Sequence, residues 1–206
     1  MDAFLDKAKN IDTIEEASAL LWEELPSPLP ATTKALELSL EAHQGQTRKS
    51  GEPYIVHPIL VAAITAKVSN DEMMVQAALL HDVVEDTSYT IEELEHEFGY
   101  DVAHMVEGLT KIVEIRDEEL VPSGSDERLI NSALTFRKML IASIKDVRVL
   151  VIKLCDRLHN MLTLEALSFE KQRRIAEETI VVYAPIAHRL GISRLKNHLE
   201  DLSFRY

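Results

Sequence analysis

The chain has 206 residues, enough to bury a hydrophobic core in one large domain or two small ones. Its formal net charge of −13 argues against a nucleic-acid-binding surface, and no apolar run is long enough to span a membrane. The lone Cys155 excludes an intrachain disulfide framework and suits a reducing compartment. Since Met1–Asn10 shows no signal-peptide pattern, we expect a cytoplasmic protein.

The composition, with 46% apolar and 5% aromatic residues, is typical of a helical protein. Residues 1–30 predict an amphipathic N-terminal helical extension, ahead of one domain over 31–206. Segment 147–154 alone could be a strand because of its β-branched residues, but apolar positions from Leu150 to Met161 continue a helical stripe. We expect helices near 32–44, 58–68, 71–86, 91–98, 102–113, 126–144, 147–161, 169–190 and 195–202, and an acidic loop over 114–126. The predicted fold class is all-α.

Local signals mark where several of these helices begin or change direction. Thr32 or Thr33 can cap the helix that follows the proline-rich stretch. The segments 69–72 and 90–93 have the pattern of capping boxes, in which a side chain at each end satisfies a backbone N–H of the other. Pro185 should bend or split the long helix that contains it, because proline removes one helical hydrogen bond.

The most informative stretch places four ionisable side chains directly after the apolar run Ala77–Leu80. On one continuous helix, His81 and Glu85 would share a line, and Asp82 and Asp86 would share the neighbouring line. Three carboxylates and an imidazole at the edge of a core are costly unless something pairs with them. A divalent metal is the simplest such partner, so we expect further ligands elsewhere in the chain.

The candidate outlying ligands are His57 and Asp156. His57 precedes a proline where a helix is expected to begin, and Asp156 interrupts an apolar helical stripe. Each has an ordinary alternative, since a lone histidine before proline is more often a capping or core residue and an acidic pair is often a solvated helix end. A histidine, an adjacent His-Asp pair and a distant aspartate, all on helices, resemble the ligand order of the HD phosphohydrolase superfamily.

Longer segments extend this resemblance to the hydrolase domain of the RelA/SpoT homologues, the bacterial alarmone enzymes. The matching segments, in order, are Arg48–Tyr54 with His57-Pro58, Ala78–Thr87, Gly108–Lys111, Arg137–Leu140, Lys153–Met161 and Tyr183–Gly191. The resemblance covers about 31–206 and implies the helical HD-domain phosphohydrolase fold. It departs from the family at Leu162, where an arginine is usual, so any ionic role there is lost or moved.

The resemblance implies a Mn²⁺-dependent hydrolase that removes the 3′-pyrophosphate from guanosine tetra- or pentaphosphate, giving GDP or GTP and pyrophosphate. The residues that match the family's metal ligands are His57, His81, Asp82 and Asp156. Those that match its catalytic acidic pair are Glu85 and Asp86, and those that match its nucleotide pocket are Arg48, Lys49, Ser50, Asn160 and Thr163. Two imidazoles and two carboxylates suit Mn²⁺ without excluding Fe²⁺ or Zn²⁺.

Two alternative functions remain open at this point. One is an HD phosphohydrolase acting on another 3′-phosphorylated nucleotide, such as NADPH. The other is a non-catalytic domain that senses alarmone, although a pure sensor has no use for Glu85. The sequence after Gly191 resembles the lead-in to the family's synthetase, so we expect the hydrolase part of a longer chain with synthetase and regulatory domains, and a complete small hydrolase is the alternative.

Overall fold

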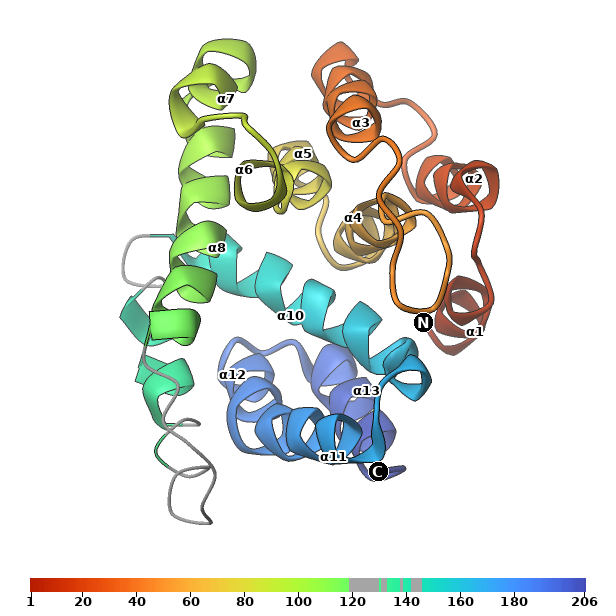
Figure 1. The fold of residues 1–206 in the computed structure, drawn as a ribbon, viewed down its shortest axis with the longest axis vertical. Coiled ribbons are helices and arrows are strands. Elements are labelled where there is room, and N and C mark those ends of the chain that lie inside the picture. Colours follow the sequence, from red (N-terminus) through yellow and green to blue (C-terminus); the bar gives the residue numbers. More distant parts are fainter. Residues whose placement is uncertain (119–129, 131–132, 138, 142–145) are drawn as a thin grey trace. The chain divides into compact units, whose positions relative to one another are not determined.

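The computed structural model describes residues 1–118, 130, 133–137, 139–141 and 146–206 (Figure 1). Within these ranges every regular element is helical, and the β-type pairing is limited to one isolated bridge between Thr47 and Pro53. The all-α prediction is therefore confirmed. The chain divides into two compact units, Met1–Thr110 and Lys111–Tyr206.

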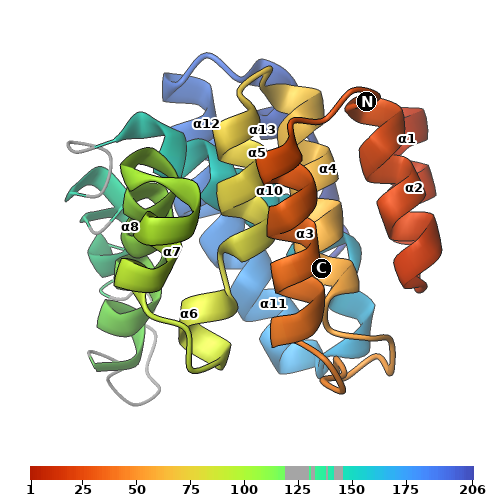
Figure 2. The same ribbon diagram turned by 90° about the horizontal axis from the view of Figure 1, so that it is seen from above.

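The first unit is built around a helix that is buried on every side. Its helices are α1 (Asp2–Lys9), α2 (Ile14–Glu24), α3 (Pro30–Ala42), α4 (Val56–Val68), α5 (Glu72–Leu80), α6 (Val83–Asp86), α7 (Ile91–Phe98) and the first part of α8 (Tyr100–Glu118). Every position from Val56 to Thr65 in α4 is buried, because this helix is apolar all round. Helices α2 and α5 pack against α4, and α3 packs against α5 (Figure 2). The core of this unit therefore surrounds the first turns of α4.

The N-terminal segment contributes to that core. Ala17, Leu20 and Leu21 form the buried face of α2, which packs on α4. Helices α1 and α2 confirm that the N-terminal segment is helical. The domain boundary that we predict between residues 30 and 31 stays a prediction.

Two of the predicted helix caps are wrong. Helix α3 begins at Pro30 without a side-chain cap, and the buried Thr32 instead donates its hydroxyl to Glu72 Oε2 at 2.6 Å. Helix α5 is capped by Asp71, whose carboxylate accepts the backbone N–H of Met73 at 2.9 Å, so the expected box at 69–72 does not form. The second box is confirmed: the Thr90 and Glu93 side chains each accept the other's backbone N–H.

The second unit contains the rest of the helices. They are the end of α8, helical residues at 133–137 and 139–141, α10 (Val147–Leu162), a 3₁₀ turn (Leu164–Ala166), α11 (Phe169–Glu178), a π-helical segment (Thr179–Tyr183), α12 (Ala184–Arg189) and α13 (Ser193–Ser203). The helical prediction for 147–161 is confirmed, and Cys155 is a buried core residue of α10. Helices α10 and α12 both pack against α13.

The predicted break near Pro185 takes the form of a π-helical segment that joins α11 to α12. A wider turn removes the clash between the proline ring and the preceding turn, and it leaves Pro185 near the start of α12, where a missing N–H costs little. Gly191 then ends α12 with a φ of 76°, and the N–H of Ile192 donates to Ala187 O at 3.0 Å. A hydrogen bond that spans residues 187–192 at a helix end requires a left-handed backbone conformation at position 191, which glycine adopts without steric cost.

The acidic loop expected over 114–126 is wrong in its first part, because residues 114–118 belong to helix α8. Residues 119–126 of that loop lie outside the described residues, as does Lys138 of the matching segment Arg137–Leu140. The helical residues at 133–137 and 139–141 agree with the helix expected near 126–144.

Candidate metal centre

The helix that carries the His-Asp pair is interrupted at that pair. Helix α5 ends at Leu80, His81 is its C-terminal cap, and Asp82 opens the separate one-turn helix α6. The His81 ring lies against the carbonyl of Ala78, with Nδ1 2.7 Å from that oxygen, and so a side chain enters the helical ladder where the helix stops. The continuous helix that we expected through residue 86 is therefore wrong.

Two adjacent side chains meet at this interruption. Neighbouring residues on a continuous helix point about 100° apart and do not face each other. Here His81 Nε2 lies 3.1 Å from Asp82 Oδ2. Both residues keep right-handed helical dihedrals at this junction, and the imidazole and the carboxylate meet between α5 and α6.

The hydrogen bond to Ala78 also assigns the proton on His81. A carbonyl oxygen only accepts, so Nδ1 must donate, and in the neutral ring Nε2 then carries a lone pair. Nε2 faces Asp82 Oδ2 at 3.1 Å, where it can pair with the carboxylate when the ring is protonated, or bind a metal ion beside it when the ring is neutral. A metal-ligating histidine has this arrangement, with its other ring nitrogen donating to a backbone carbonyl.

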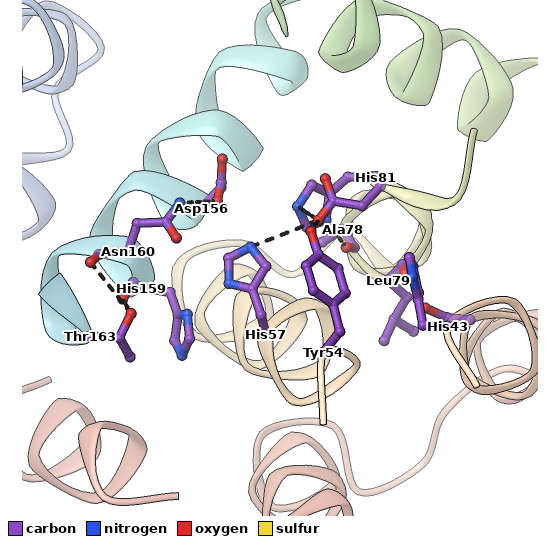
Figure 3. Close-up of polar contacts among 12 residues, drawn as sticks. His43, Tyr54, His57, Ala78, Leu79, His81, Asp156, His159, Asn160 and Thr163 are labelled. Atoms are coloured by element: carbon purple, nitrogen blue, oxygen red, sulfur yellow. Dashed lines mark hydrogen bonds and ion pairs between the residues drawn. The ribbon is translucent and has the colours of Figure 1, made fainter. Parts of the chain in front are cut away.

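His57 completes a group of three converging donors (Figure 3). It lies in the first turn of the central helix α4, and its ring meets the ring of His81 edge-on at 5.4 Å between centroids. Its Nε2 is 4.0 Å from Asp82 Oδ2, and the candidate ligand atoms of all three residues lie within 4.8 Å of one another. Both histidines are buried, with exposures of 3% and 4%, so the three side chains fit a single divalent ion.

Tyr54 also belongs to this group, although the sequence motifs did not predict it as a site residue. Its hydroxyl donates to Asp82 Oδ2 at 2.7 Å, and its ring lies edge-on to the ring of His57 at 6.3 Å. Tyr54 stands inside the segment that resembles the alarmone hydrolases, but nothing in the local pattern indicates a contact with a residue 28 positions later.

The fourth predicted ligand, Asp156, belongs to helix α10 of the second unit, where it is buried with 5% exposure. Its two carboxylate oxygens accept from Asn160 Nδ2 at 2.6 Å and from Lys153 Nζ at 2.8 Å. Thr163 caps the same helix, and its hydroxyl lies 3.5 Å from the carbonyl of Asn160. One end of α10 thus brings together three of the predicted site residues.

The two predicted catalytic acids lie close after the His-Asp pair. Glu85 and Asp86 form the exposed second half of α6, in contrast to the buried His81. The backbone N–H of Asp86 donates to the carbonyl of Asp82 at 2.9 Å, which fixes the turn that separates them. Exposure keeps both carboxylates accessible to water and to solutes.

The predicted substrate-binding loop, Gly45–Pro53, is closed by its own backbone. Arg48 N–H donates to Glu52 O at 2.9 Å, and Gly51 N–H donates to Arg48 O at 3.0 Å. Gly51 has a φ of 102°, which a residue with a side chain rarely adopts. Lys49 and Ser50 are exposed at the tip, where the Ser50 hydroxyl donates to Glu52 at 2.8 Å.

The chain matches a known family over most of its length. Residues 35–193 match the family model described as "HD domain". This chain belongs to the HD domain family. The HD domain fold expected from the sequence is thereby confirmed, and an HD domain with this His-His-Asp group implies a divalent metal ion.

Bacterial relatives of this HD domain carry alarmone-enzyme names. It is 51% identical over 182 residues to "GTP pyrophosphokinase" of Myxococcus xanthus, covering 88% of this chain and 23% of the relative. It is 51% identical over 168 residues to "Guanosine-3′,5′-bis(diphosphate) 3′-pyrophosphohydrolase" of Haemophilus influenzae, covering 82% and 24%. With "Bifunctional (p)ppGpp synthase/hydrolase SpoT" of Escherichia coli K12 it shares 44% over 191 residues, covering 92% and 26%. These relatives confirm the resemblance to RelA/SpoT homologues, and the chain spans about a quarter of their length.

A solved structure has the same fold as this HD domain. It superposes with a TM-score of 0.63 at 25% identity, covering 87% of this chain and 97% of its own. It is described as a metazoan ortholog of SpoT that hydrolyses ppGpp and plays a role in starvation responses. In the described part of the chain, the helices are all too short or too polar to cross a membrane.

Proposed function

We propose that this HD domain is a metal-dependent hydrolase that removes the 3′-pyrophosphate from guanosine tetra- or pentaphosphate, releasing GDP or GTP and pyrophosphate. The observation that carries the proposal is the convergence of the buried His57 and His81 with the part-buried Asp82, in the domain that matches named pyrophosphohydrolases. A solved relative described as hydrolysing ppGpp supports the same substrate class.

We propose Mn²⁺ as the resident ion, held by His57, His81 and Asp82 with Asp156 as the fourth ligand. The mixed nitrogen and oxygen donor set supports a borderline or hard divalent cation. The hydrogen bond from Asn160 to Asp156 supports the fourth assignment, since ligating carboxylates are commonly oriented by such donors. Lys153 also contacts Asp156, at 2.8 Å, and would share that carboxylate with the ion. When bound, such an ion acidifies a water molecule and neutralises charge on a phosphate.

The acidic pair would handle the proton and orient the attacking water. Glu85 and Asp86 are exposed carboxylates on the turn that begins at Asp82, so they can accept a proton while the buried ligands hold the ion. We assign the general base to Glu85 and a supporting role in water orientation or proton transfer to Asp86.

The anionic substrate needs local positive charge, because the chain as a whole has a formal net charge of −13. We propose that the loop Gly45–Pro53, the cationic loop, supplies this positive charge. The half-buried Arg48 offers a planar cation for a purine or a phosphate, and the exposed Lys49 offers a point charge. Ser50, Asn160 and Thr163 would add hydrogen bonds. We also propose that synthetase and regulatory domains accompany this HD domain in a longer chain, which the greater length of its relatives supports. The cytoplasmic location stays a prediction.

The decisive assay incubates the chain with guanosine tetraphosphate and Mn²⁺ and follows the release of pyrophosphate. We expect turnover in the wild type and a loss of at least about 100-fold in kcat for Glu85→Ala, which is the lower range for removing a general base. Because Glu85 is not one of the proposed ligands, Glu85→Ala should bind Mn²⁺ as the wild type does.

Glu95→Ala provides the matched control, because Glu95 is an exposed glutamate on the neighbouring helix α7. Its kcat should equal that of the wild type. Binding of guanosine tetraphosphate without any release of pyrophosphate would contradict the proposal and favour an alarmone sensor. Faster turnover of NADPH than of guanosine tetraphosphate would favour the other phosphohydrolase function.

A further inference from the structure

Tyr54 directly follows the cationic loop, Gly45–Pro53, and connects it to the metal centre. The backbone N–H of Tyr54 donates to the carbonyl of Gln46 at 2.9 Å and closes the base of the loop. Thr47 and Pro53 pair just inside that closure, through the isolated bridge. Tyr54 is therefore the point at which the loop returns to the body of the first unit.

The side chain of Tyr54 points from the loop base into the metal centre (Figure 3). Its hydroxyl reaches Asp82 Oδ2 at 2.7 Å, the same oxygen that His81 Nε2 approaches to 3.1 Å. A carboxylate oxygen has two lone pairs, so the phenol can occupy one and leave the other for a cation. The hydroxyl thus sets the rotation of the carboxylate without blocking its use as a ligand.

The aromatic ring of Tyr54 is held in place on both sides. It lies between the rings of His43, at 5.0 Å, and His57, at 6.3 Å. His43 is 1% exposed, and its Nδ1 lies 2.9 Å from Gln46 Oε1. Gln46 in turn reaches the carbonyl of Asp86 with its side-chain amide at 3.5 Å. The loop base therefore contacts both the ligand Asp82 and the end of α6.

We propose that Tyr54 is a positioning residue of the metal centre, whose hydroxyl holds the Asp82 carboxylate in its ligating orientation and ties the base of the cationic loop to it. This inference rests on the proposed metal-dependent function. Its physical basis is that a carboxylate able to rotate freely must be ordered when the ion binds, which lowers affinity. A Tyr54 that only supports the loop through its backbone and ring would leave metal affinity unchanged when the hydroxyl is removed.

The test compares Mn²⁺ affinity in the full chain with that of Tyr54→Phe, measured by the electron paramagnetic resonance signal of free Mn²⁺. The substitution removes one oxygen and keeps the ring between His43 and His57. We expect the dissociation constant to rise about 10- to 100-fold, the usual cost of losing a partner of a metal ligand. Pyrophosphate release should fall at limiting Mn²⁺ and recover at saturating Mn²⁺.

Tyr100→Phe is the matched control, since Tyr100 is a 64% exposed tyrosine at the start of α8. It should bind Mn²⁺ as the wild type does. An unchanged dissociation constant for Tyr54→Phe, with helicity intact, overturns the positioning role and leaves the proposed function standing. A wild-type chain that binds no Mn²⁺ overturns the proposed function and this inference together.

Discussion

Each unit of the molecule buries a cluster of ionisable side chains, and the two clusters offset the cost of burial in different ways. In the second unit, Arg157 is 5% exposed and donates to Glu178 Oε2 at 2.7 Å. Its guanidinium lies over the ring of Tyr183 at 3.9 Å. Burial acts to lower the pKa of Arg157, but attraction to Tyr183 and Glu178 outweighs it, so the pKa is raised and the charge is kept. This cluster carries its own neutralising partner.

The cluster of the first unit is built from two imidazoles, a carboxylate and the Tyr54 hydroxyl. The Asp82 carboxylate lies 3.1 Å from His81 Nε2, while Nδ1 of the same ring lies 2.7 Å from the carbonyl of Ala78. His57 Nε2 approaches the same oxygen. A divalent cation fits this His-His-Asp group, whereas the Arg157 cluster is built on a matched pair of charges. The difference teaches that converging metal-ligand atoms indicate an ion site, whereas a matched Arg-Glu pair over an aromatic ring indicates a structural role.

The largest effect is expected from Arg157→Ala, which tests the structural role of the Arg157 cluster. Removing the buried guanidinium leaves the part-buried Glu178 without its charged partner, so the free energy of unfolding should fall by about 3 kcal/mol, the lower end of the range for a fully buried pair. Urea unfolding followed by circular dichroism measures it. Arg173→Ala is the matched control, because Arg173 forms an exposed pair with Glu177, and its effect should stay within about 0.5 kcal/mol. Equal effects of the two variants would remove the distinction between the clusters.

The stability gained on binding Mn²⁺ tests whether the cluster of His57, His81 and Asp82 is a metal site. With free Mn²⁺ about 100-fold above its dissociation constant, the wild type should gain about 2.7 kcal/mol in the free energy of unfolding. His81→Ala should lose that gain, because it removes the Nε2 donor, whereas His96→Ala, an exposed histidine on α7, should keep it. Chemical unfolding with and without a chelator provides the measurement. The same Mn²⁺ gain in His81→Ala would refute the ligand assignment.

The smallest expected effect comes from the edge of the Arg157 cluster. The Thr135 hydroxyl donates to Glu178 Oε1 at 3.1 Å, and Thr135→Val removes this hydrogen bond with little change of shape. We expect a loss of about 1 kcal/mol in the free energy of unfolding. Thr33→Val, on the exposed face of α3, should change it by less than about 0.5 kcal/mol. No loss in Thr135→Val would restrict the cluster to Arg157, Glu178 and Tyr183.

Much of the fold could be predicted from local patterns, because helical periodicity, proline and glycine act over a few residues. The stripe from Leu150 to Met161 and the end of α12 at Gly191 are examples. The prediction failed where a distant partner decided the outcome. Thr32 has the residue type of a cap but is buried, with its hydroxyl bonded to Glu72 forty positions later.

The sequence by itself determined the chemistry of the candidate site, because the residue types at positions 57, 81 and 82 define a donor set whatever the fold. Only the tertiary structure decided how those donors meet. The meeting of His81 and Asp82 with His57 depends on how α4 packs against α5, which brings positions 57 and 81 together. The contact from Tyr54 to Asp82 required the loop base to return to α6, a non-local arrangement that no local pattern encodes.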